Sequence, residues 1–387
     1  SDAKSLCRIR TYARPSWGRT LPGHSQILDS TIRHLMSSDV AVINEFKSQI
    51  TDAKQRSACI RIRGGGSKDF HGVSLEGDLI ETKDFSGVTE YEPTELVLTA
   101  RSGTPLKDIE RTLEENNQIL PFEPPHMGSE ATFGGCIASG FSGPRRASQG
   151  AVRDFVLGAR ILNADADDLQ FGGKVMKNVA GFDVSRLLAG SFGTLGLILE
   201  SSIKVLPKPE VERTVFFELD HRSALDKMNT LAGTPIPLSA TCFDGNRLAV
   251  RLSGSEIGVT AARKKIGGET TEESSYWESI KEQTHPFFEA EGCLYRLSIN
   301  PTAPIDQYDD ALIEWNGSTR WIWNNGTLSE HQEFANQYGG YATVFRGNRL
   351  GEPINMMSPA LQKLQQKIKI SMDPDGIFGK KRLFTEF

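Results

Sequence analysis

Residues 57–68 read S-A-C-I-R-I-R-G-G-G-S-K, an alternating half followed by a glycine-rich half. Ala58, Ile60 and Ile62 alternate with polar residues, which is the period-2 pattern of a half-buried strand. Three consecutive glycines follow, and N–H groups without neighbouring side chains can converge on phosphate oxygens. The pattern is therefore that of a strand followed by a glycine loop, and it predicts that the backbone of this loop lies close to a bound anion.

Two further loops have the same character. Residues 132–140 read T-F-G-G-C-I-A-S-G, and residues 190–196 read G-S-F-G-T-L-G. Of the 37 glycines in the 387-residue chain, 20 lie between residues 64 and 196, so one third of the chain carries the glycine excess. These glycines are interleaved with Ile, Leu, Val and Phe and show no Gly-X-Y period, which excludes collagen and disfavours a low-complexity linker.

Composition excludes several other classes of protein. The net charge is −5 and no basic stripe carries interleaved aromatic residues, which argues against nucleic acid as a partner. No apolar run reaches the roughly 18 residues of a membrane-spanning helix. The five cysteines lie far apart without a C-x-x-C pair, so we expect no metal or iron–sulfur site in this chain.

The known phosphate-binding motifs are absent from the sequence. Gly172-Gly173-Lys174 is followed by Val175, which breaks the P-loop pattern, and no G-x-G-x-x-G occurs. A P-loop ATPase and a Rossmann NAD site are therefore both disfavoured. Three glycine loops, each beside a strand, favour one long ligand held at several points, and a dinucleotide with a central pyrophosphate has the right length.

Periodicity and turn residues predict an α+β chain. Thr104 is expected to cap a helix that begins at Pro105, and Pro207-Lys208-Pro209 reads as a linker. Strands are expected at 57–63, 95–100, 155–162, 169–171, 197–206, 214–219, 239–243, 247–252, 293–299 and 340–345. Helices are expected at 105–117, 183–188, 223–231, 256–266, 330–338 and 361–368. The strand–helix–strand–strand–helix order at 214–266 resembles a ferredoxin-like unit.

Five runs of sequence together resemble the FAD-binding domain of the vanillyl-alcohol oxidase, or PCMH-type, flavoproteins. They are R-G-G-G-S-K at 63–68, E-P-P-H-M-G-S-E-A-T-F-G-G at 123–135, G-P-R-R at 143–146, V-R-D-F-V-L-G at 152–158, and G-G-K-V-M-K-N-V-A-G-F-D-V-S-R-L at 172–187 followed by G-T-L-G at 193–196. Within that family the resemblance is to the E subunits of bacterial glycolate oxidases. It covers residues 36–387, which leaves residues 1–35 as an extension that we expect to be disordered or non-native.

The resemblance implies a PCMH-type FAD-binding domain of two α+β subdomains at 36–209. A ferredoxin-like-containing α+β cap domain at 210–355 follows, and a C-terminal helix and tail at 356–387 return to the first domain. FAD would lie extended between the two subdomains. The residues expected to hold it are Gly64, Gly65, Gly66, Ser67, Thr132, Gly134, Gly135, Ala138, Ser139, Gly193, Gly196 and Ile198. Asp154 and Asn178 could serve the cofactor or simply stabilise turns.

The chain departs from its catalytic relatives in two places. Related dehydrogenases carry an H-x-G-D-G-N-x-H stretch in the cap, whereas the corresponding residues 338–346 read Y-G-G-Y-A-T-V-F-R. The family commonly ends D-P-x-G-I-F-N-P-G, whereas Phe378 is followed here by Gly379-Lys380-Lys381. The missing histidines argue that this chain does not supply the base that 2-hydroxy-acid oxidation needs.

The leading hypothesis is therefore an FAD-binding subunit of a glycolate oxidase complex that relays electrons or organises the assembly. The resemblance implies a catalytic flavoprotein subunit and an iron–sulfur subunit as partners, and a cytoplasmic location at the inner face of the membrane through the complex. A first alternative is a self-sufficient 2-hydroxy-acid dehydrogenase that uses His126 with Arg346 or Arg145. A second is a structural subunit that has lost the cofactor.

Overall fold

The computed structural model describes residues 24–173, 183–270, 275–305, 308, 310–324, 326–347, 354 and 356–383, with side chains from residue 39 onward except at 324. The chain divides into two compact units, residues 1–45 and residues 46–387. Helix α1 (His24–Arg56) begins in the first unit and ends in the second, and it continues through Met36, where we expected the working protein to begin. The domain boundaries stay predictions.

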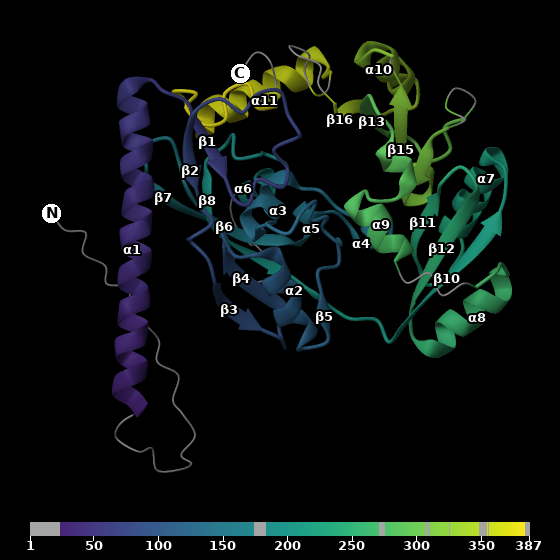
Figure 1. The fold of residues 1–387 in the computed structure, drawn as a ribbon, viewed down its shortest axis with the longest axis horizontal. Helices are drawn as coiled ribbons and strands as arrows, with labels where there is room; N and C mark the ends of the chain where they lie inside the picture. The colour runs from purple at the N-terminus through teal and green to yellow at the C-terminus, as the bar shows by residue number, and fades with distance from the viewer. Residues whose placement is uncertain are drawn as a thin grey trace. The chain divides into compact units, whose positions relative to one another are not determined.

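The second unit contains a five-stranded antiparallel sheet in the order β3-β4-β8-β6-β7. Its strands are β3 (Val88–Glu92), β4 (Val97–Arg101), β6 (Val156–Leu162), β7 (Asp168–Gly172) and β8 (Leu197–Lys204). Helices α2 (Leu106–Glu114) and α3 (Phe133–Ser139) pack on one face, where Ile109 and Ile137 join Leu98 of β4 in one buried core (Figure 1). The alternating pattern of the sequence thus produces a sheet with a helix-covered apolar face.

A smaller parallel pair carries the first glycine loop. Strands β1 (Ile60–Arg63) and β2 (Asp78–Glu81) pair in parallel, and Phe46 from the end of α1 packs edge-on against Phe85 with ring centroids 6.2 Å apart. The chain's end joins this pair, because Phe378 forms a parallel bridge with Ile60. The residues that follow helix α11 (Pro359–Met372) therefore lie beside the loop that begins at Gly64.

Short elements connect these layers. They are β5 (Gln118–Ile119), β9 (Leu206–Pro207), α4 (Arg146–Gln149), α5 (Val152–Phe155) and α6 (Val184–Leu187). The strands predicted at 155–162 and 169–171 are confirmed as β6 and β7, which form a hairpin that pairs antiparallel from Gly158–Gly172 to Leu162–Asp168.

The cap region is built on a seven-stranded sheet in the order β10-β12-β11-β14-β15-β13-β16, antiparallel at every pairing. Its strands are β10 (Val211–Glu218), β11 (Leu238–Phe243), β12 (Arg247–Gly254), β13 (Cys293–Ser298), β14 (Leu312–Glu314), β15 (Thr319–Asn324) and β16 (Tyr341–Arg346). Its helical elements are α7 (His221–Ala232), α8 (Glu256–Ile266), α9 (Tyr276–Glu282), η1 (Pro286–Glu289), η2 (Trp315–Gly317) and α10 (Leu328–Gln337).

The two faces of the cap sheet meet different partners. Helices α7, α8 and α10 cover one face, and their side chains share a core with Val250 of β12 and Tyr295 of β13. On the opposite face, Trp277 of α9 and Phe345 of β16 form a second core together with Phe141, a residue of the loop after α3. Phe141, which precedes the cap strands in the sequence and follows α3, is therefore part of the packing of the cap.

The predicted helix cap at Thr104 is wrong. Helix α2 begins at Leu106 with Pro105 as the residue before it, and no side chain caps it. The Thr104 hydroxyl instead donates to the carbonyl oxygens of Arg101, at 2.7 Å, and Gly87, at 3.2 Å. The Thr104 side chain thus bonds to the backbone at the end of β4 and just before β3, and it does not cap the first turn of α2.

Candidate functional site

The structure brings all twelve predicted cofactor residues to one cavity, which we call the glycine-lined cavity. It encloses about 940 Å³ of space, part of it open to solvent. The expected residues that line it are Gly64, Gly65, Gly66, Ser67, Thr132, Gly134, Gly135, Ala138, Ser139, Gly193, Gly196 and Ile198. They come from three separate segments, and the expected loop at 132–140 is wrong, because Phe133–Ser139 form helix α3 with Thr132 as its N-cap. The meeting of these segments is the arrangement expected for one long ligand, while each residue's role stays a prediction.

The first loop can approach its neighbours only because it has no side chains. A Cβ at Gly65 would lie 1.4 Å from the carbonyl oxygen of Glu130, inside any allowed contact distance. Gly66 has a φ of +73°, the left-handed region that favours glycine. The loop therefore presents bare backbone to the cavity, which is what close approach to a phosphate requires.

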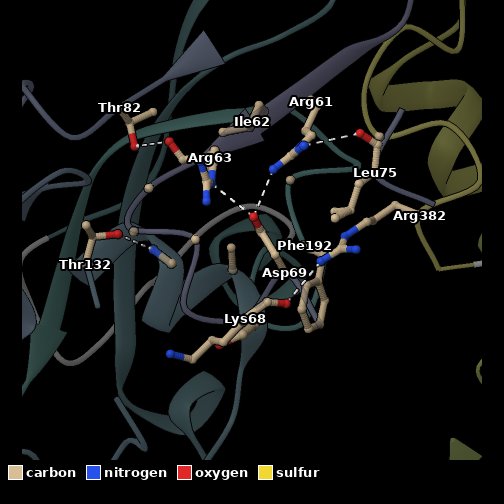
Figure 2. A pocket seen from close by; sticks show the side chains of 18 of the residues that line it. Arg61, Ile62, Arg63, Lys68, Asp69, Leu75, Thr82, Thr132, Phe192 and Arg382 are labelled. Carbon is tan, nitrogen blue, oxygen red and sulfur yellow. Dashed lines mark hydrogen bonds and ion pairs between the residues drawn. The ribbon is translucent and has the colours of Figure 1, made fainter. Parts of the chain in front are cut away.

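Cationic side chains surround this backbone. Asp69 accepts from Arg61 Nη2 at 2.8 Å and pairs with Arg63 Nε at 3.0 Å, so one carboxylate holds both guanidinium groups (Figure 2). Arg382, from the C-terminal tail, lies 5.5 Å from the ring centre of Phe192 and donates to the carbonyl oxygen of Lys68 at 3.2 Å. The described lining holds five cations, Arg61, Arg63, Lys68, Lys380 and Arg382, against the two carboxylates of Asp69 and Glu76, so the cavity is cationic.

Several donors at the cavity remain unused within the described structure. The hydroxyl of Ser102 and Nε of Arg61 are buried with no hydrogen-bond partner among the described residues. The Lys68 ammonium donates to Ser67 Oγ at 3.1 Å and to the carbonyl oxygen of His126 at 2.9 Å. Burial lowers the pKa of Lys68 from its ordinary value. Buried donors without partners are costly, so they indicate a ligand that satisfies them.

These residues fit an FAD. The bare backbone of 64–67 and the cations Arg61 and Arg382 suit a pyrophosphate, and the apolar Ile62, Phe192 and Ile198 suit flat ring systems. A dinucleotide has both kinds of surface in one molecule. The cavity therefore has the chemical composition that the cofactor requires.

The C-terminal tail is part of the same cavity, although the tail carries no asparagine after Phe378. Gly379, Lys380 and Arg382 line the cavity. Lys369 of α11 fixes this segment by donating to the carbonyl oxygens of Thr194, at 2.8 Å, and Phe378, at 2.6 Å. Sequence reasoning did not identify Arg382 as a cavity residue, because no local pattern indicates that the tail returns beside β1.

A second and larger cavity adjoins the first. This cap cavity encloses about 2220 Å³, and Ser139 and Phe192 line both cavities. Among the described residues that line either cavity, His71 is the one histidine. Its ring stacks on Phe192 at 5.0 Å, and its Nδ1 lies 3.0 Å from the carbonyl oxygen of Phe345. Burial lowers the pKa of His71 to about 4, so the ring is a weak base.

Neither weak catalytic candidate lies among the described residues that line these cavities. His126 Nε2 pairs with Glu110 Oε2 of α2 at 2.9 Å. Arg346 donates to Gln283 Oε1 at 2.8 Å and lies 5.3 Å from the ring centre of Phe70. Both side chains are thus held by other residues of the chain, His126 by Glu110 and Arg346 by Gln283.

Arg145 belongs to a network that joins the first region to the cap. Its Nε donates to Glu123 Oε1 at 3.0 Å, and its Nη2 pairs with Glu212. Arg251 of β12 donates to the same Glu123 at 2.8 Å. Burial opposes ionisation of Glu123, but Arg251 and Arg145 outweigh it and hold the pKa of this carboxyl below its usual value. The run that begins at Glu123 therefore connects two regions rather than presenting a base.

Two uncertain residues have different outcomes. Asp154 accepts from the backbone N–H of Ala151 at 2.8 Å, which is a structural role at the start of α5. Asn178 lies outside the described residues. The structure also holds no helix long and apolar enough to cross a membrane within the part of the chain that it describes.

Comparisons with known proteins agree with this geometry. A model of an FAD binding domain matches residues 40–171. Glycolate oxidase subunit GlcE of Escherichia coli (strain K12) is 41% identical over 339 residues, which are 87% of this chain and 96% of that protein. Glycolate oxidase subunit GlcD of Bacillus subtilis (strain 168) is 30% identical over 227 residues, which are 58% of this chain and 48% of that protein.

A solved structure confirms the architecture. An alkyldihydroxyacetonephosphate synthase superposes with a TM-score of 0.62 at 16% identity, over 86% of this chain and 74% of that one. At that identity the likeness shows the fold alone, which is the PCMH-type arrangement expected from the sequence. The near full-length relationship to GlcE shows more: the chain belongs to the family of glycolate oxidase E subunits, its cofactor is FAD, and it is a subunit of an FAD-dependent 2-hydroxy-acid oxidoreductase.

Proposed function

We propose that this chain is the FAD-holding subunit of a glycolate oxidase complex and that it relays electrons or organises the complex without oxidising glycolate itself. The observation that carries the proposal is that the described walls of the two cavities hold one histidine, His71, and that this histidine is buried. Burial lowers its pKa to about 4, and its Nδ1–H donates to the carbonyl oxygen of Phe345.

The reaction needs a group to take the hydroxyl proton of a 2-hydroxy acid. A base with a pKa of about 4 is mostly unable to hold that proton at neutral pH, so His71 is poorly matched to the task. FAD, when bound, supplies the redox chemistry by accepting two electrons. This chain's own contribution is to hold and orient the cofactor with the loop at 64–67, helix α3 with its N-cap Thr132, and the segment 193–198 that leads into β8.

The proposed partners follow from the family. A catalytic flavoprotein subunit would supply the base, and an iron–sulfur subunit would carry electrons toward a membrane acceptor, with the assembly at the inner face of the cytoplasmic membrane. Support for a second flavoprotein comes from the similarity of this chain to GlcD, which is named as another subunit of glycolate oxidase.

A self-sufficient dehydrogenase is the competing function, and His126 is its named base. His126 is an unsuitable base in this arrangement because it is not among the described residues that line either cavity, and its Nε2 pairs with Glu110 of α2 instead. Nothing in the geometry favours this function over the proposed one.

The experiment compares the purified chain with the assembled complex, using an artificial electron acceptor and glycolate. We expect no turnover from the FAD-loaded chain alone, and turnover when it is co-expressed with the catalytic flavoprotein and iron–sulfur subunits. Turnover by the single chain would contradict the proposal. A preparation that stays colourless after FAD is added, yet assembles with its partners, would instead favour a structural subunit without cofactor.

A further inference from the structure

The cap cavity contains an unusual distribution of charge. Its described lining includes the cations Arg146, Arg153, Arg186, Arg296 and Lys369, and no Asp or Glu. Two of them are neutralised nearby, since Arg186 Nε pairs with Asp183 at 2.9 Å and Lys369 Nζ pairs with Asp373 at 2.6 Å. Within the described residues the other three have no carboxylate ion pair.

Aromatic rings, rather than acids, position two of these three arginines. The guanidinium of Arg146 lies 4.4 Å from the ring centre of Trp315. That of Arg296 lies 5.7 Å from the ring centre of Phe345, and its Nε is buried with no hydrogen-bond partner among the described residues. Cation–π contacts hold a guanidinium in place while leaving its N–H donors available. Glu314 and Asp154 lie near enough to favour the charged forms of Arg296 and Arg146, but neither forms an ion pair with them within the described residues, so these arginines can still take carboxylate oxygens from a ligand.

The pKa of the Tyr341 phenol is lowered by the same excess of positive charge. Burial would raise its pKa, but Arg296, a hydrogen bond with Ser298, Arg146 and Arg153 together lower it. Burial, and then Arg296, likewise lower the pKa of Arg146. The three arginines therefore lie close enough to repel one another, and a bound polyanion would relieve that repulsion.

The same cavity exposes apolar side chains at its edge. Leu187 is 46% exposed, Met356 44% and Leu361 43%, and all three line the cavity. Exposed apolar residues next to arginine, methionine and aromatic side chains, with acids absent, are the composition of a protein interface. Charge alone would suit any anion, but the apolar edge suits a ligand that also has apolar side chains.

The volume of the cap cavity favours a protein segment over a small acid as its ligand. Sites for small molecules typically enclose roughly 300–1,000 Å³. The cap cavity encloses about 2220 Å³, part of it open to solvent, which is far more than a two-carbon acid occupies. Three unpaired cations also exceed the single charge of such an acid.

From these observations we infer that the cap cavity is a docking site for an acidic, partly apolar segment of a partner subunit. Carboxylates of that segment pair with Arg146, Arg153 and Arg296, and its apolar side chains cover Met356 and Leu361. The inference rests on the proposed function, because it assumes that the chain works within a complex. It assigns the partner contact to the cap cavity, leaving the glycine-lined cavity to the cofactor.

The test uses the full FAD-loaded chain and a labelled peptide of repeated Glu-Glu-Leu units, with the matching Gln-Gln-Leu peptide as control. Binding is followed by the anisotropy of the label and by the intrinsic tryptophan fluorescence of the chain, to which Trp315 contributes beneath the guanidinium of Arg146. We expect the acidic peptide to bind at least about tenfold more tightly than the neutral one, and the difference to shrink as salt is raised.

Variants locate the binding. Arg146→Gln should lower the affinity for the acidic peptide by about tenfold and remove the change in tryptophan fluorescence. Arg153→Gln, at an exposed position, should lower that affinity by about threefold. Arg263→Gln, an exposed arginine of α8 outside the cavity, is the matched control and should bind the peptide as the unaltered chain does. The flavin content of each preparation, measured separately, tests the cofactor assignment and not the docking site.

Three results would overturn the inference. The first is equal binding of the acidic and neutral peptides. The second is acidic-peptide binding that Arg146→Gln and Arg153→Gln leave unchanged, which would place it elsewhere. The third is no peptide binding while millimolar glycolate or oxalate changes the intrinsic tryptophan fluorescence, which would make the cavity a small-acid site.

Discussion

The glycine-lined cavity and the cap cavity share Ser139 and Phe192 but are built in different ways. The first is made largely of backbone from two glycine-rich loops and helix α3, and its arginines Arg61 and Arg63 share the carboxylate of Asp69. The second is made of side chains on strands and helices, and three of its arginines have no carboxylate ion pair in the described structure. Backbone contacts suit a permanently bound cofactor with a fixed chemical structure. Arginines without ion-pair partners suit a protein partner that binds reversibly.

The largest expected effect comes from breaking the first cavity alone. Gly65→Ala would place a Cβ 1.4 Å from the carbonyl oxygen of Glu130, so the loop must move. We expect bound FAD to fall by at least about tenfold and the free energy of unfolding by about 2 kcal/mol. The ratio of flavin to protein absorbance, together with thermal unfolding, measures both.

Gly173→Ala is the control for this loop, because a Cβ there meets nothing within 4 Å. It should retain FAD and stability. If Gly65→Ala also retained full flavin content, the pyrophosphate assignment of this loop would be wrong.

The next effect concerns the joint between the two regions. Glu123→Gln leaves Arg145 and Arg251, whose side chains are 8% and 3% exposed, with the half-buried Glu212 as the remaining carboxylate that they share within the described residues. We expect a loss of about 3 kcal/mol in the free energy of unfolding. Glu130→Gln, which removes a surface pair with Lys83, should cost less than about 1 kcal/mol. Equal losses in denaturant unfolding would show that the buried network does not join the regions.

The same network predicts a pH dependence. Because the arginines hold the pKa of Glu123 below its usual value, its contribution to stability is present at neutral pH and is lost as the pH falls through the folded-state pKa. The unaltered chain should therefore lose stability below about pH 4.5 more steeply than Glu123→Gln. Parallel curves of unfolding free energy against pH would exclude this role for Glu123.

A smaller effect tests the contribution of the tail to the first cavity. Lys369→Met removes the donor that fixes Thr194 and Phe378, and with it the placement of Gly379 and Arg382. We expect FAD to bind about tenfold more weakly by equilibrium titration. Lys367→Met, at an exposed position of α11, should leave the affinity unchanged, and an equal loss in both variants would argue against the tail's role.

The smallest expected effect is at His126. His126→Ala removes one pairing with Glu110 and should change the glycolate turnover of the assembled complex by less than about twofold. A loss of two or more orders of magnitude, with flavin content intact, would support the self-sufficient dehydrogenase.

The two cavities also differ in how far the sequence could predict them. The glycine-lined cavity was predictable, because glycine loops after strands are local patterns that carry their own physical reason. Helix α8 was predicted at its observed bounds for the same reason, since Ser255 caps it and its apolar positions repeat with helical spacing. Strands β2, β3, β14 and β15 were not predicted, because cross-strand packing rather than a local pattern fixes them. Helices α3 and α9 were not predicted either, since each is a seven-residue helix, too short for a clear helical period.

The cap cavity could not be predicted from the sequence. Arg146 lies within a run that was read as part of the cofactor domain, and Arg296 and Met356 are separated from it by more than a hundred residues. Only the seven-stranded sheet and helix α11 bring these side chains to one cavity. Glu123 shows the same limit, since its partner Arg251 lies on β12 of the cap.

The central claim is that binding FAD and oxidising glycolate belong to different chains, and an anaerobic absorbance spectrum of the purified chain tests it most directly. After loading with FAD, the chain should be yellow and should keep its oxidised flavin band when glycolate is added. It should lose that band with dithionite, which shows that the flavin can be reduced. Rapid bleaching by glycolate in the absence of any other subunit would contradict the account.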